Sequence, residues 1–169
     1  MAQALLITTE DVVKFTALNG GLDVDKFIQF VKVAQDINIQ AALGSNLYEK
    51  ISSDVIAGNL TGNYLNLVKV FIKPMLIHWT MTHFLPFASY TIANKGVYKH
   101  GSENSVSVEK NEVDYLVEKS RDMAEHYQQR FLDYMCVNYT LFPEYSNNTT
   151  EDMKPETNNF NSGWFIDND

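Results

Sequence analysis

The chain has 169 residues and a net charge of −8, with 45% hydrophobic and 12% aromatic residues. This length predicts one domain with a core of its own, and this composition excludes an intrinsically disordered chain. The acidic balance argues against a protein that grips phosphate backbones, and the single cysteine, Cys136, excludes an intramolecular disulfide or a cysteine-built metal site.

The negative charge is concentrated in the last third of the chain. Residues 1–108 carry eight acids and eight bases, whereas residues 109–169 carry thirteen acids and five bases. One interpretation is a solvated helix followed by a solubilising tail. The other is a face or tail with an electrostatic role of its own.

Three helices are predicted before residue 60, because apolar residues recur three and four apart between helix-capping and helix-ending residues. Acids follow the first cap directly, as is favourable at a helix N-terminus. The caps and stops are Thr8 and residues 19–21 for the first helix, Asp23 and Gly44 for the second, and Ser45 and Gly58 for the third.

A fourth helix, from about Tyr64, is apolar on nearly every side. A helix without a polar face must be covered all round by other parts of the protein. Pro74 lies inside this run, and because proline lacks an amide hydrogen it predicts a kink or a break into two helices. Pro86 ends the run or kinks it again, and residues 87–94 can continue as another turn or two of helix.

Residues 95–107 are predicted to form an exposed, protruding loop that contains two glycines. The fragments Val97–Tyr98 and Val106–Val108 could pair within it as a small hairpin. A loop of this length between two strong helices is typical of a functional or mobile segment.

The last helix is predicted to be the longest, beginning after a cap at Ser105 or Ser107. Thirty residues of helix reach roughly 45 Å, which is more than a compact domain of this size needs, so part of it is expected to pack on a neighbouring subunit. Its apolar stripe alternates four and three apart, as in a packing seam. The seam residues are Val113, Val117, Ser120, Ala124, Tyr127, Phe131 and Tyr134.

The character of the sequence changes at residue 140, which separates a helical domain, residues 1–139, from an extended arm, residues 140–169. The arm holds six acids, one lysine, six asparagines and two prolines, with no helical period. Its aromatic residues favour an arm that binds a neighbouring copy, with folding back or disorder as the alternatives. The predicted interface residues are Phe142, Pro143, Tyr145, Phe160, Trp164 and Phe165.

The side chains that could support catalysis do not converge in the sequence. His78 and His83 are five apart and lie on different faces of an ideal helix, and Glu125 and His126 are adjacent and point in different directions. Cys136 is interpreted as a small buried side chain. The glycines match no phosphate loop or dinucleotide fingerprint. The prediction is a protein without enzymatic activity, metal or cofactor.

Neither a targeting segment nor a membrane span is predicted. The first residues lack a basic region and meet two acids by position 11, unlike a signal peptide. Residues 74–94 contain no Asp, Glu, Lys or Arg, but their histidines, threonines and Pro86 favour a buried helix over a membrane helix. The expectation is a soluble protein made in a cytoplasm, with no membrane partner.

Five segments, in this order along residues 23–145, resemble the small head–tail connector (adaptor or ring) proteins of tailed bacteriophages, and most closely those of crAss-like phages of gut Bacteroidetes. The first resembles the "LG..LY" turn between two early helices of that group, and the second its proline-bearing middle helix. The others resemble its loop, its long last helix and its tail. The segments are Ile39–Tyr48, Phe71–Leu76, Asn94–Val97, Ala124–Arg130 and Phe142–Tyr145.

The resemblance implies an all-α bundle that assembles as a ring, typically of twelve copies, beneath the portal in the virion neck. Such rings are assembled in the host cytoplasm, contact the portal and other neck or tail proteins, and line the channel through which double-stranded DNA leaves. No catalytic residue or cofactor is implied. The departures are residues 146–169 and the length of the 95–107 loop, which leave open the neck tier and the partner of the arm.

An acidic last third suits such a channel, because like charge repels DNA that must pass without adhering. The predicted channel-lining residues are Glu112, Glu118 and Glu125. The alternative function is a cytoplasmic helical-bundle adaptor or regulator that binds a partner helix along the seam between Val113 and Tyr134. The two hypotheses share a fold and differ in stoichiometry.

Overall fold

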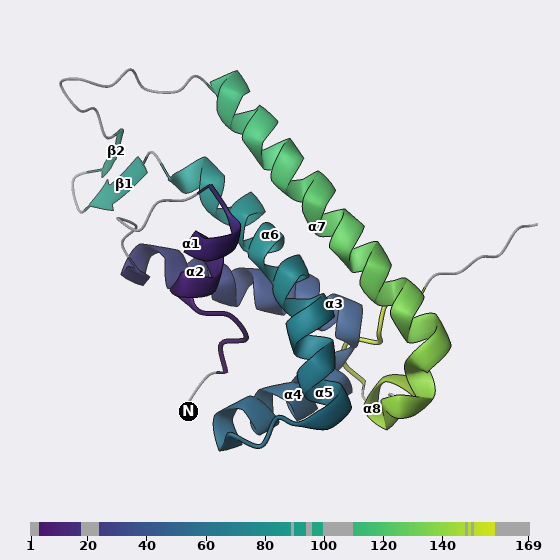
Figure 1. The fold of residues 1–169 in the computed structure, drawn as a ribbon. Coiled ribbons are helices and arrows are strands. Elements are labelled where there is room, and N and C mark those ends of the chain that lie inside the picture. The colour runs from purple at the N-terminus through teal and green to yellow at the C-terminus, as the bar shows by residue number, and fades with distance from the viewer. Residues whose placement is uncertain are drawn as a thin grey trace, which may run out of the picture.

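The structure, a computed structural model, describes residues 4–17, 24–88, 90–93, 96–99, 110–147, 149 and 151–157 (Figure 1). The α-helices are α1 (Thr9–Phe15), α2 (Val24–Ala34), α3 (Gln40–Leu43), α4 (Ser45–Ala57), α5 (Gly62–Leu67), α6 (Lys73–Phe84), α7 (Lys110–Asn138) and α8 (Pro143–Ser146). Two π-helical turns, Gln35–Ile39 and Val68–Ile72, join α2 to α3 and α5 to α6. The 3₁₀ turns are Leu85–Phe87 and Tyr139–Leu141, and the strands of one hairpin are β1 (Tyr90–Ala93) and β2 (Gly96–Lys99).

Helix α6 lies at the centre of an all-α bundle, as the sequence predicts. It packs against α7 on one side and α2 on another, and α1 also contacts it. Figure 1 shows α7 running alongside α6, with α4 and α5 at the far end of the molecule from the hairpin. Met75, Leu76 and Ile77, three consecutive residues, are all buried, and no residue of α6 is exposed.

Pro74 is accommodated by a π-helical turn instead of a break. The turn Val68–Ile72 directly precedes α6, and the amide of Lys73 donates to the carbonyl of Val68, five residues back. Pro74 follows at the second position of α6, where a missing amide hydrogen is tolerated. The predicted interruption is therefore a local widening of one helical run, a feature typical of π-helical turns.

The expectation of further helix over residues 87–94 is wrong. Pro86 sits in the 3₁₀ turn that ends α6, and Tyr90–Ala93 forms a strand antiparallel to Gly96–Lys99. The β-branched and aromatic residues of Tyr90–Ala93 favour extended backbone once proline has ended the helix. Val97 and Tyr98 do lie in a hairpin, but they pair with Ile92 and Thr91. The expected partner, residues 106–108, lies outside the described residues.

Some of the other predicted helix ends are confirmed, and the predicted stop at residues 19–21 lies outside the described residues. Thr8 caps α1 through a reciprocal capping box with Asp11, and Gly58 ends α4 in a left-handed conformation with φ 68°. Ser45, however, is the first residue of α4, and Gly44 occupies the cap position with φ 74°. The expected caps Asp23, Ser105 and Ser107 lie outside the described residues.

A buried glutamine fastens the N-terminal segment to the bundle. Gln35 is fully buried in the π-helical turn after α2. Its Oε1 accepts from the amide of Leu6 at 2.8 Å, and its Nε2 donates to the carbonyl of Ala4 at 3.0 Å and to the hydroxyl of Tyr48 at 3.2 Å. One amide side chain thus provides hydrogen-bond partners for two backbone groups of a segment that forms no regular secondary structure.

We expect Gln35→Met to lower the free energy of unfolding by about 2–3 kcal/mol, because it leaves the buried Leu6 amide without a partner. Urea titration followed by circular dichroism measures the loss. Gln129→Met, at an exposed position of α7, is the control and should change stability by less than about 0.5 kcal/mol. Equal effects of the two substitutions would contradict an anchoring role for Gln35.

Candidate functional site

The long helix α7 carries three faces with different chemistry. The predicted seam is confirmed as its packing face, because Ala124 and Phe131 are buried and the other seam residues are at least half-buried. This face lies against α6 of the same chain. At Ala124 and Phe131 the seam is therefore covered by α6.

One exposed face of α7 is acidic. Asp114, Glu118 and Asp122 follow one another at intervals of four, and Glu125 lies one heptad after Glu118. At 3.6 residues per turn these four side chains project from the same side of the helix, and all four residues are exposed. We call Asp114, Glu118, Asp122 and Glu125 the acidic face.

The acidic face differs from the predicted channel-lining trio. Glu118 and Glu125 belong to it, but Glu112 lies six residues before Glu118 and thus about a third of a turn away. Asp114 and Asp122, which the sequence analysis missed, take part instead. Their spacing of four from Glu118 is the signal that could have identified them.

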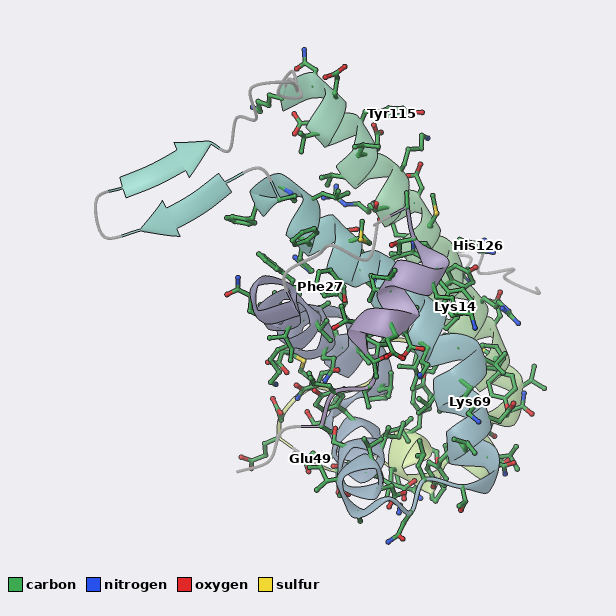
Figure 2. All side chains as sticks on the ribbon, turned by 60° about the vertical axis from the view of Figure 1, so that its left-hand side comes forward. Lys14, Phe27, Glu49, Lys69, Tyr115 and His126 are labelled. Atoms are coloured by element: carbon green, nitrogen blue, oxygen red, sulfur yellow. The ribbon has the colours of Figure 1, made fainter. Side chains whose placement is uncertain are left out.

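The third face of α7 is apolar and basic, and it was not predicted. Tyr115, Leu116, Met123 and Val137 are 58%, 47%, 47% and 79% exposed. Lys119 and His126 lie between them on the same side of the helix, where Figure 2 labels Tyr115 and His126. We call these six residues the apolar–basic face. Lys119 forms an ion pair with Asp122 at 3.1 Å, and two acids, Glu112 and Asp133, lie on this side one heptad before Lys119 and one heptad after His126. Exposed apolar groups in a row mark an interaction surface more often than isolated ones do.

The beginning of the arm folds back onto its own chain, which corrects part of the predicted interface. Phe142 is fully buried and Tyr145 is 8% exposed, and both belong to the same hydrophobic core as α6. The two rings lie on either side of Pro143, which begins α8 and is exposed. Residue 140 therefore does not separate this part of the arm from the domain. The remaining predicted interface residues, Phe160, Trp164 and Phe165, lie outside the described residues.

Residues 151–157 of the arm are held at the start of α4 by an arrangement that we call the clasp. The amide of Ser45 donates to the carbonyl of Met153 at 2.9 Å, and its hydroxyl donates to Oδ2 of Asp152 at 2.6 Å. Gln40 donates to the same carboxylate oxygen at 3.2 Å, and the amide of Glu156 donates to the carbonyl of Ala41 at 3.1 Å. The contacts bridge more than one hundred residues of sequence.

The clasp supplies the hydrogen-bond acceptors of an N-terminal cap, which α4 lacks locally. Gly44 precedes α4 and has no side chain to accept from the first amides of the helix. The Met153 carbonyl accepts from one of those amides, and the Asp152 carboxylate lies close to the positive end of the helix dipole. The arm thereby completes a helix end that the local sequence leaves open.

A second set of polar contacts joins the arm to α6 and α7. Trp79 donates from Nε1 to Gln128 at 3.1 Å, and Gln128 donates to the carboxylate of Glu156 at 2.6 Å. The Tyr145 hydroxyl donates to the carbonyl of Glu156 at 2.9 Å. Residue 156 is thus fixed from three elements.

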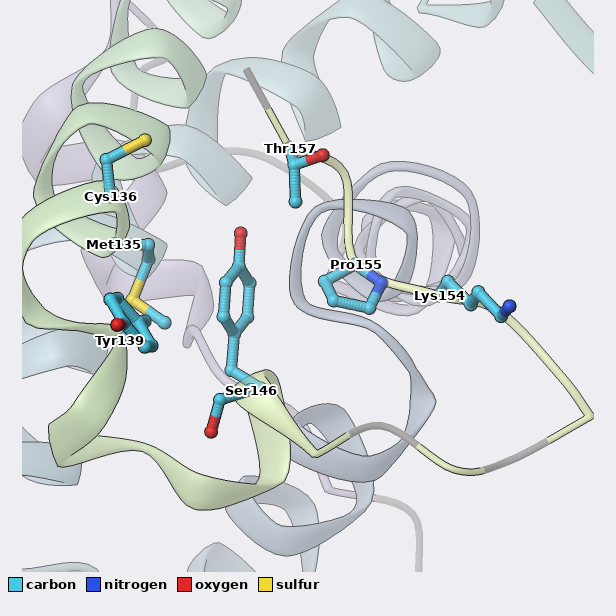
Figure 3. A pocket seen from close by; sticks show the side chains of 8 residues that line it. Met135, Cys136, Tyr139, Ser146, Lys154, Pro155 and Thr157 are labelled. Atoms are coloured by element: carbon cyan, nitrogen blue, oxygen red, sulfur yellow. The ribbon is translucent and has the colours of Figure 1, made fainter. Parts of the chain in front are cut away.

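A cavity of about 530 Å³ lies between the end of α7 and the arm (Figure 3). Cys136 lines it and is exposed, which corrects the expectation of a buried thiol. Burial, followed by the nearby Cys136 and Glu156, raises the pKa of Tyr145 to about 12, so its hydroxyl stays protonated near neutral pH. The lining residues include no carboxylate or imidazole that could act as a base for the thiol.

The two histidines of α6 make structural contacts. The ring of His78 stacks on Tyr127 with centroids 5.5 Å apart, and Nε2 of His83 lies 2.8 Å from Oδ1 of Asn38. Burial lowers the pKa of His78, and burial together with Arg121 lowers that of His83. Within the part of the chain that the structure describes, no three His, Cys, Asp or Glu side chains gather as metal ligands would.

Across the described ranges, none of the helices combines the length and the apolar character needed to cross a bilayer.

We expect Asp152→Ala to lower the free energy of unfolding by about 1 kcal/mol, because it removes the acceptor that serves Ser45 and Gln40 at the start of α4. Amide hydrogen exchange over residues 151–157 should become roughly tenfold faster as the arm detaches more often. Glu151→Ala changes the neighbouring exposed acid and is the matched control. Unchanged exchange in Asp152→Ala would show that the clasp does not hold the arm.

The comparisons with known proteins place the chain in a family without assigning a function. A family of unknown function, DUF6712, matches residues 39–154. No curated protein and no solved structure matches the chain. The matched range begins just before Gln40 and Ser45 and ends just after Asp152 and Met153, so it includes both sides of the clasp. The chain therefore belongs to the DUF6712 family of unknown function.

Proposed function

We propose that this protein is a structural subunit of a ring in the neck of a tailed bacteriophage. The ring connects the portal and head to the tail, lines the DNA channel and carries out no catalysis. Twelve copies is the number that follows from the resemblance of segments such as Ile39–Tyr48 to phage connector proteins. In this proposal the subunit binds further copies of itself, the portal and other neck or tail proteins, and is assembled in the host cytoplasm before it resides in the virion.

The observation that carries the proposal is the division of α7 into three faces about a third of a turn apart. The seam is used by the subunit itself, while the acidic face and the apolar–basic face are both exposed. A closed ring joins subunits through two different surfaces on each copy, unlike a two-fold dimer. A helix with two chemically distinct free faces suits such an arrangement.

The length of α7 supports the same proposal. Its 29 residues span roughly 43 Å, and its first turns extend beyond the end of α6 in Figure 1. Val113, Val117 and Ser120 are only half-buried, in contrast to Ala124 and Phe131 further along the seam. Among the described residues, the first half of α7 is therefore less covered than the second half, which suits a contact with a neighbouring copy.

We assign the acidic face to the channel. The carboxylates of the acidic face, of which Asp122 is paired with Lys119, repeat around a ring and create a negative wall that DNA passes without adhering, because the phosphates are repelled.

The first test is the assembly state of the purified full-length chain, measured by light scattering and negative-stain imaging. We expect rings, alone or on a purified portal, and we expect the double substitution Leu116→Glu and Met123→Glu to abolish them by placing charge on the apolar–basic face. Both residues are about half exposed, so circular dichroism should show an unchanged fold.

Asn111→Glu with Thr140→Glu adds the same charge at exposed positions outside the apolar–basic face and should leave assembly intact. Rings that persist in the Leu116 and Met123 variant would refute the assigned contact. A wild-type chain that stays monomeric at every concentration, with and without portal, would refute the proposed function itself.

The second test concerns the channel. Replacing Asp114, Glu118 and Glu125 by lysine should make assembled rings bind a short DNA duplex at least roughly tenfold more tightly at about 0.1 M salt, as measured by fluorescence anisotropy. In virions, the same change should slow or stall genome ejection. The control replaces Glu10, Glu49 and Glu151, which are exposed acids outside α7, by lysine and reaches the same net charge. Equal DNA binding by the two triple variants would show that the acidic face does not line the channel.

A further inference from the structure

A pocket with apolar walls and a cationic rim opens between α1, α6 and α7. Its volume is about 340 Å³, and Phe15, Pro74, Ile77 and Tyr127 form its apolar walls. Lys69 and Lys73 line it as well. Tyr127, which lines the pocket, has its ring centroid 5.6 Å from that of His126, so the pocket borders the apolar–basic face; Figure 2 labels Lys14, Lys69 and His126.

The positive charge of this pocket is only partly neutralised. Lys73 donates to Oδ2 of Asp11 at 2.8 Å, and the same carboxylate accepts from the amide of Thr8 at 3.0 Å. Burial raises the pKa of Asp11, but the contacts with Lys73 and Thr8 outweigh it and leave the pKa below its usual value. Asp11 is therefore ionised and fully engaged near neutral pH.

Two further lysines add charge that Asp11 does not balance. Lys69 has no ion-pair partner among the described residues, and Lys14 sits over the ring of Phe15 with Nζ 5.5 Å from the centroid. In a chain with a net charge of −8, this local excess of lysines next to apolar walls is complementary to an acidic segment with large apolar side chains.

The chain itself contains such a segment. Residues 158–169 carry three aromatic residues and two acids and have no lysine or arginine. Trp164 and Phe165 can supply the apolar anchors, and Asp167 and Asp169 can pair with lysines at the rim. The segment and the pocket are thus complementary in both apolar character and charge.

The path of the arm favours a pocket on another copy. Glu156 is bound to Gln128, and Thr157 lines the same cavity as Cys136, which places the arm along the side of α7 that bears Gln128 and Cys136. The pocket lies beside Tyr127, which is about a quarter of a turn around the helix from Gln128 and about half a turn from Cys136. To enter its own pocket, the segment would have to pass around α7, whereas a neighbouring copy can present a pocket directly.

We propose that residues 158–169 of one copy bind the pocket formed by Phe15, Lys69, Ile77 and Tyr127 of the next copy. Each subunit then contributes one segment and one pocket, which is the head-to-tail pairing that a closed ring requires. This inference rests on the self-association in the proposed function and names the contact that links adjacent copies.

The test uses two full-length variants that each disable one half of the contact. The first variant, Phe15→Ser with Lys69→Glu, alters the pocket; Phe15 is 60% exposed, and Lys69 has no ion-pair partner among the described residues. The second variant, Trp164→Ser with Phe165→Ser, alters the segment. Light scattering should show that each variant alone needs at least a tenfold higher concentration to assemble. An equimolar mixture should form a two-copy species that neither variant forms alone, because one intact segment then meets one intact pocket.

Matched controls separate this contact from general effects of composition. Ile56→Ser with Lys110→Glu makes the same kinds of change at exposed positions away from the pocket, and Asn158→Ser with Asn161→Ser changes the segment without its aromatic residues. Both controls should assemble like the wild type. Circular dichroism establishes that every variant is folded.

A disulfide cross-link supplies a second measurement. In a Cys136→Ser background, chains with Lys69→Cys and chains with Trp164→Cys are mixed and oxidised with oxidised glutathione, which accepts the electrons lost by the two thiols. We expect a linked two-copy band on a non-reducing gel, and no such band when Lys110→Cys replaces Lys69→Cys.

The outcomes distinguish this inference from the proposed function. Pocket and segment variants that assemble like the wild type overturn the inference and leave the ring intact. Cross-linking only within a single chain carrying both cysteines would place the segment in its own pocket and overturn the contact between copies. A wild-type chain that never self-associates overturns both.

Discussion

The covering of α6, none of whose residues is exposed, is the constraint on which the rest of the structure depends. A helix that is apolar on nearly every side is unstable in water, so α2, α1 and α7 pack around it. Once α7 is packed on α6 through Ala124 and Phe131, its other two faces are left exposed. The exposed acidic and apolar–basic faces, which carry the proposed function, are therefore a consequence of how α6 is covered.

The arm caps the start of α4, and the same contacts fix the position of residues 152–156 on the domain. Gly44 leaves the first amides of α4 without a capping side chain, and Asp152 and Met153 supply acceptors from the far end of the sequence. The chain emerges from the clasp at a defined place beside α7. A segment that begins at a fixed point loses less entropy when it binds a neighbour than one that begins at a free end.

The local pattern of the sequence predicts most elements, because their determinants are close together in the chain. Thr8 and Asp11 form a capping box three residues apart, Gly58 ends α4, and the seam of α7 repeats at intervals of three and four. The candidate site was only partly predictable. The predicted Glu118 and Glu125 share one side of α7 with Asp114 and Asp122, whereas the predicted Glu112 lies about a third of a turn away, because six residues do not complete a whole number of helical turns.

The amino-acid sequence by itself determined the all-α class, the buried middle helix and the length of α7, since these follow from composition and period. Only the tertiary structure decided that Phe142 and Tyr145 enter the chain's own core, that Cys136 is exposed and that Asp152 serves the start of α4. These outcomes depend on contacts between residues about one hundred positions apart or on which side of a helix its neighbours cover. No local pattern encodes such contacts, because they exist only once the helices have packed.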